Sequence, residues 1–336
     1  MNARMDKAQA IAQHILRNIS APRRFPPGTE RSASKPLIVG ISGPQGIGKT
    51  TLTNRLVSTL SSAPHNLRVF SFSTDDLYLP YKEQEALSQR YPDNKLIEFR
   101  GLPGTHDVPL GAATFRALCH ANDHAHSRTP PSHGHHATSM SVPIPAYDKA
   151  LNAGRGDQIP RDQWPQAETP IDVILFEGWS LGFKSIRDPN ELREIYQNHS
   201  TFPPYYLAKH PFSSIETVNR SLEAYEREWY SYLDVFVHLS APNLATVFKW
   251  RAEQERDLWA KKGAGMTEDQ VREFVSRFMP AYEVYLERMH GENLFKDGID
   301  VSASSLTGPD GVSPIGRHLR VDLDEDRDLI SATLVE

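Results

Sequence analysis

The run Pro36-Leu-Ile-Val-Gly-Ile-Ser42, followed at once by Gly43-Pro-Gln-Gly-Ile-Gly48-Lys49-Thr50-Thr51, indicates the architecture of this 336-residue chain. The first seven residues are mainly apolar and predict a short buried strand of a parallel sheet. The next nine contain the pattern G-x-x-x-x-G-K-[ST], and Lys49–Leu60 is compatible with a helix. A strand, a glycine-rich loop and a helix in this order are typical of a site for a nucleoside triphosphate.

Each part of this phosphate-binding loop (P-loop, residues 43–51) has a physical purpose. Gly46 and Gly48 let successive backbone N–H groups turn toward one anion, because no Cβ obstructs a positive φ or the approach of a phosphate. We expect Lys49 to contact the β- and γ-phosphates and Thr50 to offer its hydroxyl to Mg²⁺. The predicted nucleotide-binding residues are Gly43, Gln45, Gly46, Ile47, Gly48, Lys49, Thr50 and Thr51.

Four further runs predict strands, at 67–73, 171–176, 235–239 and 319–323. Long helical or irregular stretches separate them, which favours parallel crossovers and an α/β fold with a mostly parallel central sheet. At the N-terminus, Ile11, Ile15 and Ile19 have helical spacing and predict a helix that packs on the domain. We divide the chain into this helix with its linker (1–35) and one domain (36–336).

Two stretches are predicted to be insertions, at 119–142 and 187–212. Six of the 14 histidines lie between His120 and His136. A metal site is one interpretation of the first stretch. A solvated loop is favoured, because nothing nearby suggests a rigid set of metal ligands.

Acidic residues follow two of the predicted strands. Glu177 ends the run at 171–176, and a carboxylate at the carboxyl edge of a parallel sheet is placed to hold Mg²⁺ directly or through water. Asp75 and Asp76 follow the run at 67–73 and reach the same edge. Neighbouring side chains point in different directions, so we expect only one of the two to face the γ-phosphate. An acceptor hydroxyl needs such a group to orient it and take its proton.

The overall composition excludes several classes of protein. The single cysteine, Cys119, excludes an intramolecular disulfide framework and fits a reducing, cytoplasmic location. The formal charge of −5 does not favour binding to nucleic acid or to an anionic membrane. No apolar stretch approaches the roughly 20 residues that span a bilayer.

Taken together, these motifs resemble a known group of enzymes. The P-loop, Asp75-Asp76-Leu77-Tyr78 and Phe176-Glu177-Gly178-Trp179 are similar to those of the P-loop small-molecule kinases, which include uridine kinase, phosphoribulokinase and bacterial pantothenate kinase. The segments 100–107, 145–149 and 154–157 more closely resemble plant-type D-glycerate 3-kinase and its fungal relatives. The resemblance implies a P-loop NTPase three-layer sandwich with a helical lid.

The resemblance also implies site residues. It assigns Asp75 as the catalytic base and Glu177 to magnesium, and it places a lid and its following helix at 249–290. In the lid, one of Arg251 and Arg256 is expected to reach the transferring phosphoryl group while the other pairs with a carboxylate such as Glu253.

The acceptor pocket is expected to pair cations with a carboxylate and polar groups with hydroxyls. The candidate cations are Arg100, Lys149 and Arg155, and the candidate hydroxyl partners are His106, Asp107, Tyr147 and Asp148. A nucleoside pocket would instead need an aromatic platform, which Tyr78, Tyr147 and Trp179 are able to supply.

The sequence therefore favours an ATP- and Mg²⁺-dependent kinase that phosphorylates D-glycerate at its 3-hydroxyl. Two alternatives stay open at this point: a uridine-type nucleoside kinase, and an ATP-binding regulatory or assembly protein that phosphorylates nothing.

Overall fold

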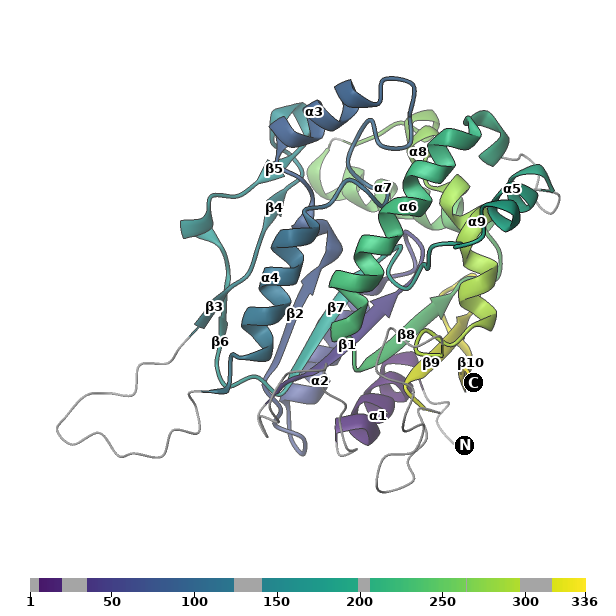
Figure 1. The fold of residues 1–336 in the computed structure, drawn as a ribbon. Helices are drawn as coiled ribbons and strands as arrows, with labels where there is room; N and C mark the ends of the chain where they lie inside the picture. The colour runs from purple at the N-terminus through teal and green to yellow at the C-terminus, as the bar shows by residue number, and fades with distance from the viewer. Residues whose placement is uncertain (1–5, 20–34, 124–140, 199–205, 264, 297–315) are drawn as a thin grey trace.

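A mostly parallel sheet forms the centre of the protein in the computed structural model (Figure 1). The structure describes residues 6–19, 35–123, 141–198, 206–263, 265–296 and 316–336. Within these ranges the sheet has six strands in the order β10-β9-β8-β1-β7-β2, and only β10 runs antiparallel to its neighbour. The strands are β1 (Leu37–Ser42), β2 (Val69–Ser73), β7 (Val173–Gly178), β8 (Val235–Ser240), β9 (His318–Leu323) and β10 (Leu329–Leu334).

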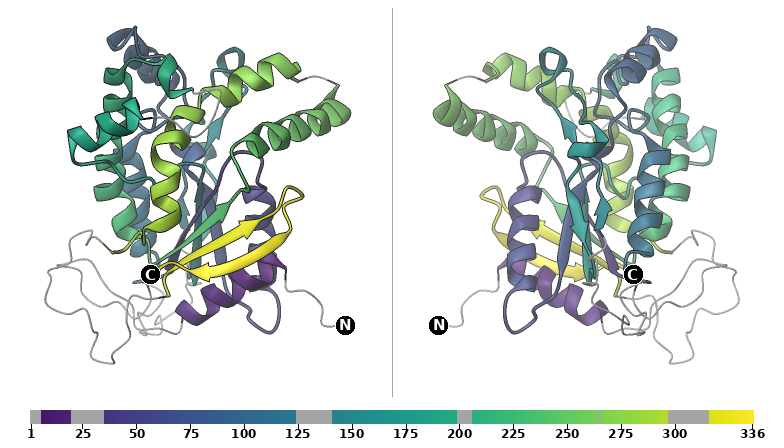
Figure 2. Two further views of the ribbon diagram at one scale, coloured as in Figure 1. Left: turned by 90° about the vertical axis from the view of Figure 1, so that its right-hand side faces the viewer. Right: turned by 90° about the vertical axis from the view of Figure 1, so that its left-hand side faces the viewer.

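Helices cover both faces of this sheet, so the protein has three layers (Figure 2). The helices are α1 (Lys7–Ile19), α2 (Lys49–Ser61), α3 (Tyr81–Arg90), α4 (Val108–Cys119), α5 (Pro189–Gln197), α6 (Phe212–Glu228), α7 (Ala245–Lys262), α8 (Glu268–Ser276) and α9 (Met279–Gly291). Helices α1 and α2 pack on one face, and α4, α6 and α9 pack on the other. Helices α7 and α8 project beyond the sheet as a pair.

Two small antiparallel pairs lie beside the main sheet. Strand β3 (Ser141–Pro143) pairs with β6 (Gln166–Glu168), and β4 (Tyr147–Asp148) pairs with β5 (Asp157–Gln158). They bring the segment that contains Lys149 and Arg155 toward the carboxyl edge of the sheet.

The predicted apolar patterns account for the core. Strands β1, β7 and β8 are buried at every position, as expected for central strands of a parallel sheet covered on both faces. In α1, Ile11 and Ile15 are fully buried and pack in the same cluster as Leu37 and Val39 of β1. The predicted N-terminal helix is therefore an integral part of the packed core.

Strand register places three chain segments at one point on the sheet edge. Glu177 of β7 is the register partner of Ile41 in β1 on one side and of Ser73 in β2 on the other. The P-loop follows β1 directly, and Asp75 lies two residues beyond Ser73. The sequence-predicted carboxylates and the P-loop therefore leave adjacent strands at the same level.

The predicted α/β fold with a mostly parallel sheet is confirmed, and each predicted strand run overlaps an observed strand. Strand β10 was missed because it lies at the sheet edge, largely exposed, and lacks a buried apolar run.

Most of the predicted linker and of the His-rich stretch lies outside the described residues. In the part of the chain that the structure describes, no group of three or more histidine, cysteine, aspartate or glutamate side chains is arranged to hold a metal ion. None of the described helices combines the length and apolar character needed to cross a membrane.

Candidate active site

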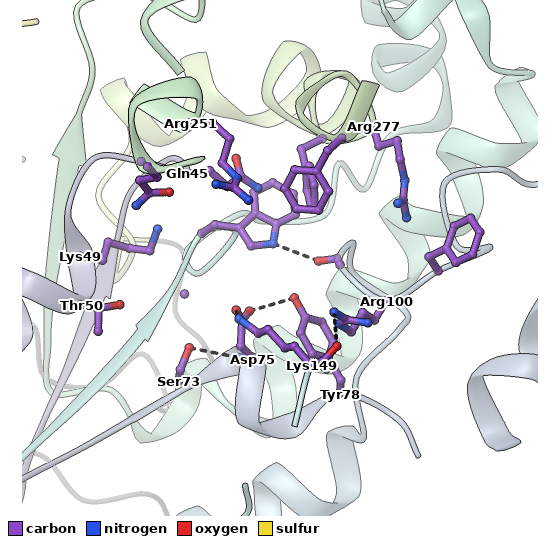
Figure 3. A pocket seen from close by; sticks show the side chains of 18 of the residues that line it. Gln45, Lys49, Thr50, Ser73, Asp75, Tyr78, Arg100, Lys149, Arg251 and Arg277 are labelled. Carbon is purple, nitrogen blue, oxygen red and sulfur yellow. Dashed lines mark hydrogen bonds and ion pairs between the residues drawn. The ribbon is translucent and has the colours of Figure 1, made fainter. Parts of the chain in front are cut away.

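A cleft of about 750 Å³ opens at the carboxyl edge of β1, β7 and β2 (Figure 3). Its walls come from the P-loop, the turn after β2 and the end of β7. Helices α7 and α8, the junction that follows α8, and the segments around Arg100 and Lys149 complete them. Lys49, Asp75 and Glu177 all line this one cleft. The candidate residues for binding phosphate, holding a metal and accepting a proton are thus brought together.

The P-loop has the backbone shape that its glycines predict. Gly46 and Gly48 have φ values of 80° and 93°, in the region that favours glycine. A Cβ on Gly46 would lie 2.5 Å from Cβ of Trp250, so α7 is able to pack against the loop only because this residue is glycine. The loop is also held from outside, where Arg327 Nε donates a hydrogen bond to the Gly46 carbonyl at 2.8 Å.

Lys49 lies across the loop with its ammonium group hydrogen-bonded to backbone carbonyls. Nζ donates to the oxygen of Gly43 at 2.7 Å and to that of Pro44 at 3.2 Å. Burial lowers the pKa of Lys49, and the negative charges of Glu177 and Asp75 oppose this effect. A desolvated ammonium beside a glycine-rich loop is a strong attractor for a polyphosphate.

Glu177 is buried at the end of β7 and is fixed by two threonine hydroxyls of α2. Thr50 Oγ1 donates to Glu177 Oε1 at 2.8 Å, and Thr53 Oγ1 donates to Oε2 at 3.0 Å. A hydroxyl and a carboxylate in contact beside a phosphate-binding loop form the oxygen-rich donor set that Mg²⁺ prefers, with phosphate oxygens to complete it. Thr50 and Glu177 therefore fit a magnesium ion.

The two adjacent aspartates after β2 have different positions. The short 3₁₀ helix Thr74–Leu77 carries both. Asp76 caps this helix, because its carboxylate accepts a hydrogen bond from the Ser73 amide at 2.8 Å. Asp75 lines the cleft instead. The expectation that only one of the pair faces the cleft agrees with this geometry.

Asp75 is held by two partners. Its Oδ1 accepts a hydrogen bond from the Tyr78 hydroxyl at 2.8 Å, and its Oδ2 forms an ion pair with Lys149 Nζ. Burial acts to raise the pKa of Asp75, but the Lys149 ammonium and the Tyr78 hydroxyl outweigh it and hold this pKa below its ordinary value. For Asp76, burial raises the pKa to about 6, with a smaller contribution from the nearby Asp75 charge. Asp75 is thus the more acidic member of the pair and stays ionised when the pH falls below the pKa of Asp76.

Tyr78, which holds Asp75, is packed against further aromatic rings. His106 stacks on Tyr78 with ring centroids 4.5 Å apart, and its Nδ1 is 2.7 Å from the Tyr225 hydroxyl. Burial lowers the pKa of His106 to about 4. The ring is therefore neutral and supports Tyr78 from behind.

The four residues that we predicted as hydroxyl partners do not line the cleft. Asp148 accepts a hydrogen bond from the Ala150 amide at 2.8 Å instead. His106 lies behind Tyr78. Asp107 caps α4 by accepting a hydrogen bond from the Leu110 amide at 2.9 Å. Tyr147 packs edge-on against Tyr78, with its hydroxyl donating to the carbonyl of Arg155 at 3.2 Å. These positions do not support the predicted contacts, and we assign no acceptor contact to the four residues.

The predicted cations Arg100, Lys149 and Arg155 all line the cleft. Arg100 donates to the carbonyls of Gly154 at 2.8 Å and Lys149 at 3.4 Å. Arg155 pairs with Glu85 at 3.5 Å.

The two lid arginines lie in different places. Arg251 lines the cleft and forms a largely buried ion pair with Glu255 at 2.7 Å. Arg256 is exposed and does not line the cleft. The expected partner Glu253 binds Arg327 instead, at 2.7 Å. On a helix, Arg251 and Glu255 are four residues apart and share a face, which explains this choice of partner.

Sequence reasoning missed three residues that shape the site. Tyr282 of α9 donates a hydrogen bond to the side chain of Gln45 at the tip of the P-loop. Arg327, in the turn between β9 and β10, contacts the same loop. Arg277, between α8 and α9, lines the cleft. Each lies more than 200 residues from the P-loop, and no local motif marks them.

Comparisons with known proteins find relatives named as kinases, although no family model matches the sequence. The chain is 33% identical over 297 residues to the chloroplastic D-glycerate 3-kinase of Arabidopsis thaliana; the match covers 88% of this chain and 54% of the plant enzyme, so the chain spans about half of that relative. It is 34% identical to an uncharacterized kinase of Schizosaccharomyces pombe, with 75% of this chain and 82% of the relative covered.

A solved structure extends the likeness to nearly the whole chain. The D-glycerate 3-kinase of Cryptococcus neoformans superposes with a TM-score of 0.77 at 30% identity, over 97% of this chain and 98% of that one. The fold is thus common to this chain and to a solved structure named as a D-glycerate 3-kinase.

Proposed function

The chain belongs to the family of P-loop kinases related to D-glycerate 3-kinase, and on this premise we propose that it transfers the γ-phosphoryl group of ATP to the 3-hydroxyl of D-glycerate. One observation carries the proposal: Lys49, Glu177 and Asp75 line a single cleft. These are the groups that phosphoryl transfer to an alcohol requires, namely a phosphate anchor, a metal ligand and a proton acceptor.

The P-loop residues bind the triphosphate. The backbone N–H groups of residues 45–50 and the ammonium of Lys49 surround its β- and γ-phosphates. Thr50 and Glu177 would hold Mg²⁺. When bound, this ion offsets negative charge on the phosphates and on the transferring group. The hydroxyl of Thr53 keeps the Glu177 carboxylate oriented.

Asp75 prepares the acceptor. Its carboxylate orients the acceptor hydroxyl and takes the proton as the new oxygen–phosphorus bond forms. The bond between the γ-phosphorus and the bridging oxygen breaks, and ADP leaves with that electron pair. Because the pKa of Asp75 lies below its ordinary value, the group is ionised and ready to accept a proton at neutral pH.

The helices α7 and α8 serve as the lid. Arg251 reaches the cleft from α7, and its ion pair with Glu255 fixes the direction of the side chain. We assign Arg251 to the transferring phosphoryl group, where its remaining N–H groups stabilise developing negative charge. The lid also excludes water, which would otherwise compete with the acceptor.

The charge of the cleft suits an anionic acceptor beside an anionic nucleotide. Its acidic lining residues are Asp75 and Glu177. Its cationic lining residues are Lys49, Arg100, Lys149, Arg155, Arg251 and Arg277. A small hydroxy acid such as glycerate is bound well by cations in a narrow polar cleft, whereas a nucleoside needs donors and acceptors for a base edge.

An acceptor panel tests the proposal. Purified protein with Mg²⁺ and ATP is assayed for ADP release with D-glycerate, L-glycerate, glycerol and uridine, each against the background without acceptor. We expect D-glycerate to give the highest kcat/KM. Strong turnover of uridine without turnover of glycerate would support a nucleoside kinase, and tight ATP binding with no turnover on any acceptor would support a regulatory protein.

A further inference from the structure

Arg277 reaches the cleft from the junction between α8 and α9. It follows the last residue of α8 and precedes Phe278 and α9. Its side chain lines the same cleft as Asp75 and the P-loop. Figure 3 shows its guanidinium group pointing into the cleft on the side where Arg100 lies. Two arginines from segments far apart in the sequence therefore meet at one end of the cleft.

Among the residues that the structure describes, no carboxylate forms an ion pair with the guanidinium group of Arg277. Its Nη2 is buried and has no hydrogen-bond partner, and within the described part of the chain the side chain makes neither a hydrogen bond nor an ion pair. Its contact is with the ring of Phe99, whose centroid lies 4.7 Å from Cζ. Burial lowers the pKa of Arg277; the charges of Glu98 and Glu273 oppose this effect only from a distance. A desolvated cation without a partner is costly unless a ligand supplies the opposite charge.

The other cations at this end of the cleft already have partners. Lys149 is paired with Asp75, and Arg155 is paired with Glu85. Arg100 donates two hydrogen bonds to backbone carbonyls. Among the cationic side chains at this end of the cleft, Arg277 is the one to which the described residues offer no hydrogen-bond acceptor.

The position of Arg277 is set by rigid packing. Gly101 has a φ of 145°, and a Cβ there would lie 2.9 Å from the ring of Phe278. Trp179 Nε1 donates to the Gly101 carbonyl at 2.9 Å, and its ring packs edge-on against Phe278 with centroids 5.0 Å apart. The residue next to Phe278 is therefore held in place before any ligand binds. A pre-positioned group loses less conformational entropy on binding than a mobile one.

We propose that Arg277 is the carboxylate anchor of the acceptor, and that it selects small hydroxy acids over neutral alcohols. This inference rests on the proposed function, since it concerns the acceptor of the same site. The planar guanidinium donates two parallel hydrogen bonds to a carboxylate, an arrangement that an ammonium group does not reproduce. Arg100, across the cleft, adds positive charge at the same end. With its carboxylate held here, the acid presents its hydroxyl toward Asp75.

The test compares Arg277→Met and Arg277→Lys with the wild type in steady-state kinetics. Loss of a charge-assisted hydrogen-bond pair weakens binding roughly 10- to 150-fold. We expect Arg277→Met to raise KM for D-glycerate by this factor, while KM for ATP and any turnover that the wild type shows with glycerol stay at the wild-type values. Arg277→Lys should recover part of the loss, because it keeps the charge without the planar fork. Arg272→Met is the matched control, since Arg272 is exposed on α8 and lies outside the cleft.

An equal loss with glycerol and with D-glycerate, or an unchanged KM for D-glycerate, would overturn the assignment. A binding measurement separates failure of this inference from failure of the proposed function. Calorimetry with D-glycerate and with lactate is performed on wild type and Arg277→Met in the presence of Mg²⁺ and a non-hydrolysable ATP analogue. If the wild type binds D-glycerate or lactate and the variant does not, the assignment of Arg277 as the carboxylate anchor is supported, even when glycerate is not phosphorylated. If the wild type binds neither acid, or if both proteins bind them equally, the anchor is refuted.

Discussion

The ammonium group of Lys149 forms an ion pair with the carboxylate of Asp75, and so joins the β4 segment to the turn after β2. The Asp75 carboxylate also accepts a hydrogen bond from the Tyr78 hydroxyl, with 2.8 Å between the two oxygens. The Lys149 side chain is about half exposed, so the pair adds little to the stability of the fold. Its effect is on Asp75, whose pKa it lowers against the opposing effect of burial. We infer that Lys149 keeps the proposed base ionised.

Replacing Lys149 by methionine should therefore shift the acid limb of the pH–rate profile upward. With the ammonium removed, burial is the larger remaining influence and raises the pKa of Asp75. As the pH falls, the variant should lose activity at a higher pH than the wild type does. The measurement is kcat/KM as a function of pH. Lys82→Met, on the exposed side of α3, should keep the wild-type profile, and an unshifted acid limb in Lys149→Met would refute this role.

A second prediction concerns Glu177, which accepts hydrogen bonds from Thr50 and Thr53. Glu177→Gln keeps the shape of the side chain but removes the charge and replaces one acceptor by a donor. Loss of a ligand or of its supporting contact commonly reduces metal affinity about 10- to 100-fold. The concentration of Mg²⁺ that gives half-maximal turnover should increase by this factor. Glu168→Gln, on exposed β6, serves as the control, and an unaltered Mg²⁺ titration for Glu177→Gln would remove the residue from the metal site.

Much of the cleft is predictable because its parts follow buried strands. The apolar runs that became β1, β2 and β7 locate the P-loop, Asp75 and Glu177 at one edge of the sheet, and the pairing of Glu177 with both Ile41 and Ser73 brings them to the same level. Local sequence also distinguishes strand from loop here, since the fully buried runs are unbroken.

Other features depend on contacts that the sequence does not encode locally. Tyr282 reaches Gln45 from α9, and Arg277 enters the cleft only because Gly101 lets Phe278 pack closely. Conversely, His106 has the polarity of an acceptor ligand, but its ring is covered by Tyr78 and bonded to Tyr225. Residue type predicts the chemistry that a side chain is capable of; tertiary packing decides whether it reaches the ligand.

A group of buried histidines lies away from the cleft, among β8, β9, α9 and α1. His238 stacks on His290 with centroids 4.9 Å apart, lies 6.5 Å from His318, and has no hydrogen-bond partner on either ring nitrogen within the described residues. Burial lowers the pKa of His290 to about 4 and that of His318 to about 3. On α1, burial likewise lowers the pKa of His14 to about 4. The folded protein therefore holds these rings neutral.

The neutral histidines predict loss of stability in mild acid. Their pKa values lie below the ordinary value of 6.5, so the unfolded chain binds more protons and the free energy of unfolding decreases as the pH falls from about 6.5 toward 4. Each such group contributes up to about 1.4 kcal/mol per pH unit in this window, and nothing above it. Urea unfolding between pH 7.5 and 4.5 measures the slope.

The variant His318→Asn should reduce that slope, because asparagine does not titrate. In the wild type, His318 Nδ1 accepts a hydrogen bond from the Leu294 amide at 3.3 Å, and the asparagine oxygen is able to accept it in the variant. His65→Asn, in the turn before β2, should leave the slope as in the wild type. Identical slopes for His318→Asn and wild type would show that acid sensitivity arises elsewhere.

The most direct measurement is single-turnover phosphoryl transfer from ATP to D-glycerate by Asp75→Asn, with Asp76→Asn as its neighbour control. Asp75→Asn should slow the transfer step by about 10²–10⁴-fold while ATP binds as tightly as to the wild type, since only proton acceptance is lost. Asp76→Asn keeps an oxygen for the Ser73 amide and should retain most of the rate. Transfer by Asp75→Asn at nearly the wild-type rate would contradict the account, because the carboxylate beside Lys149 would then not be the group that activates the acceptor.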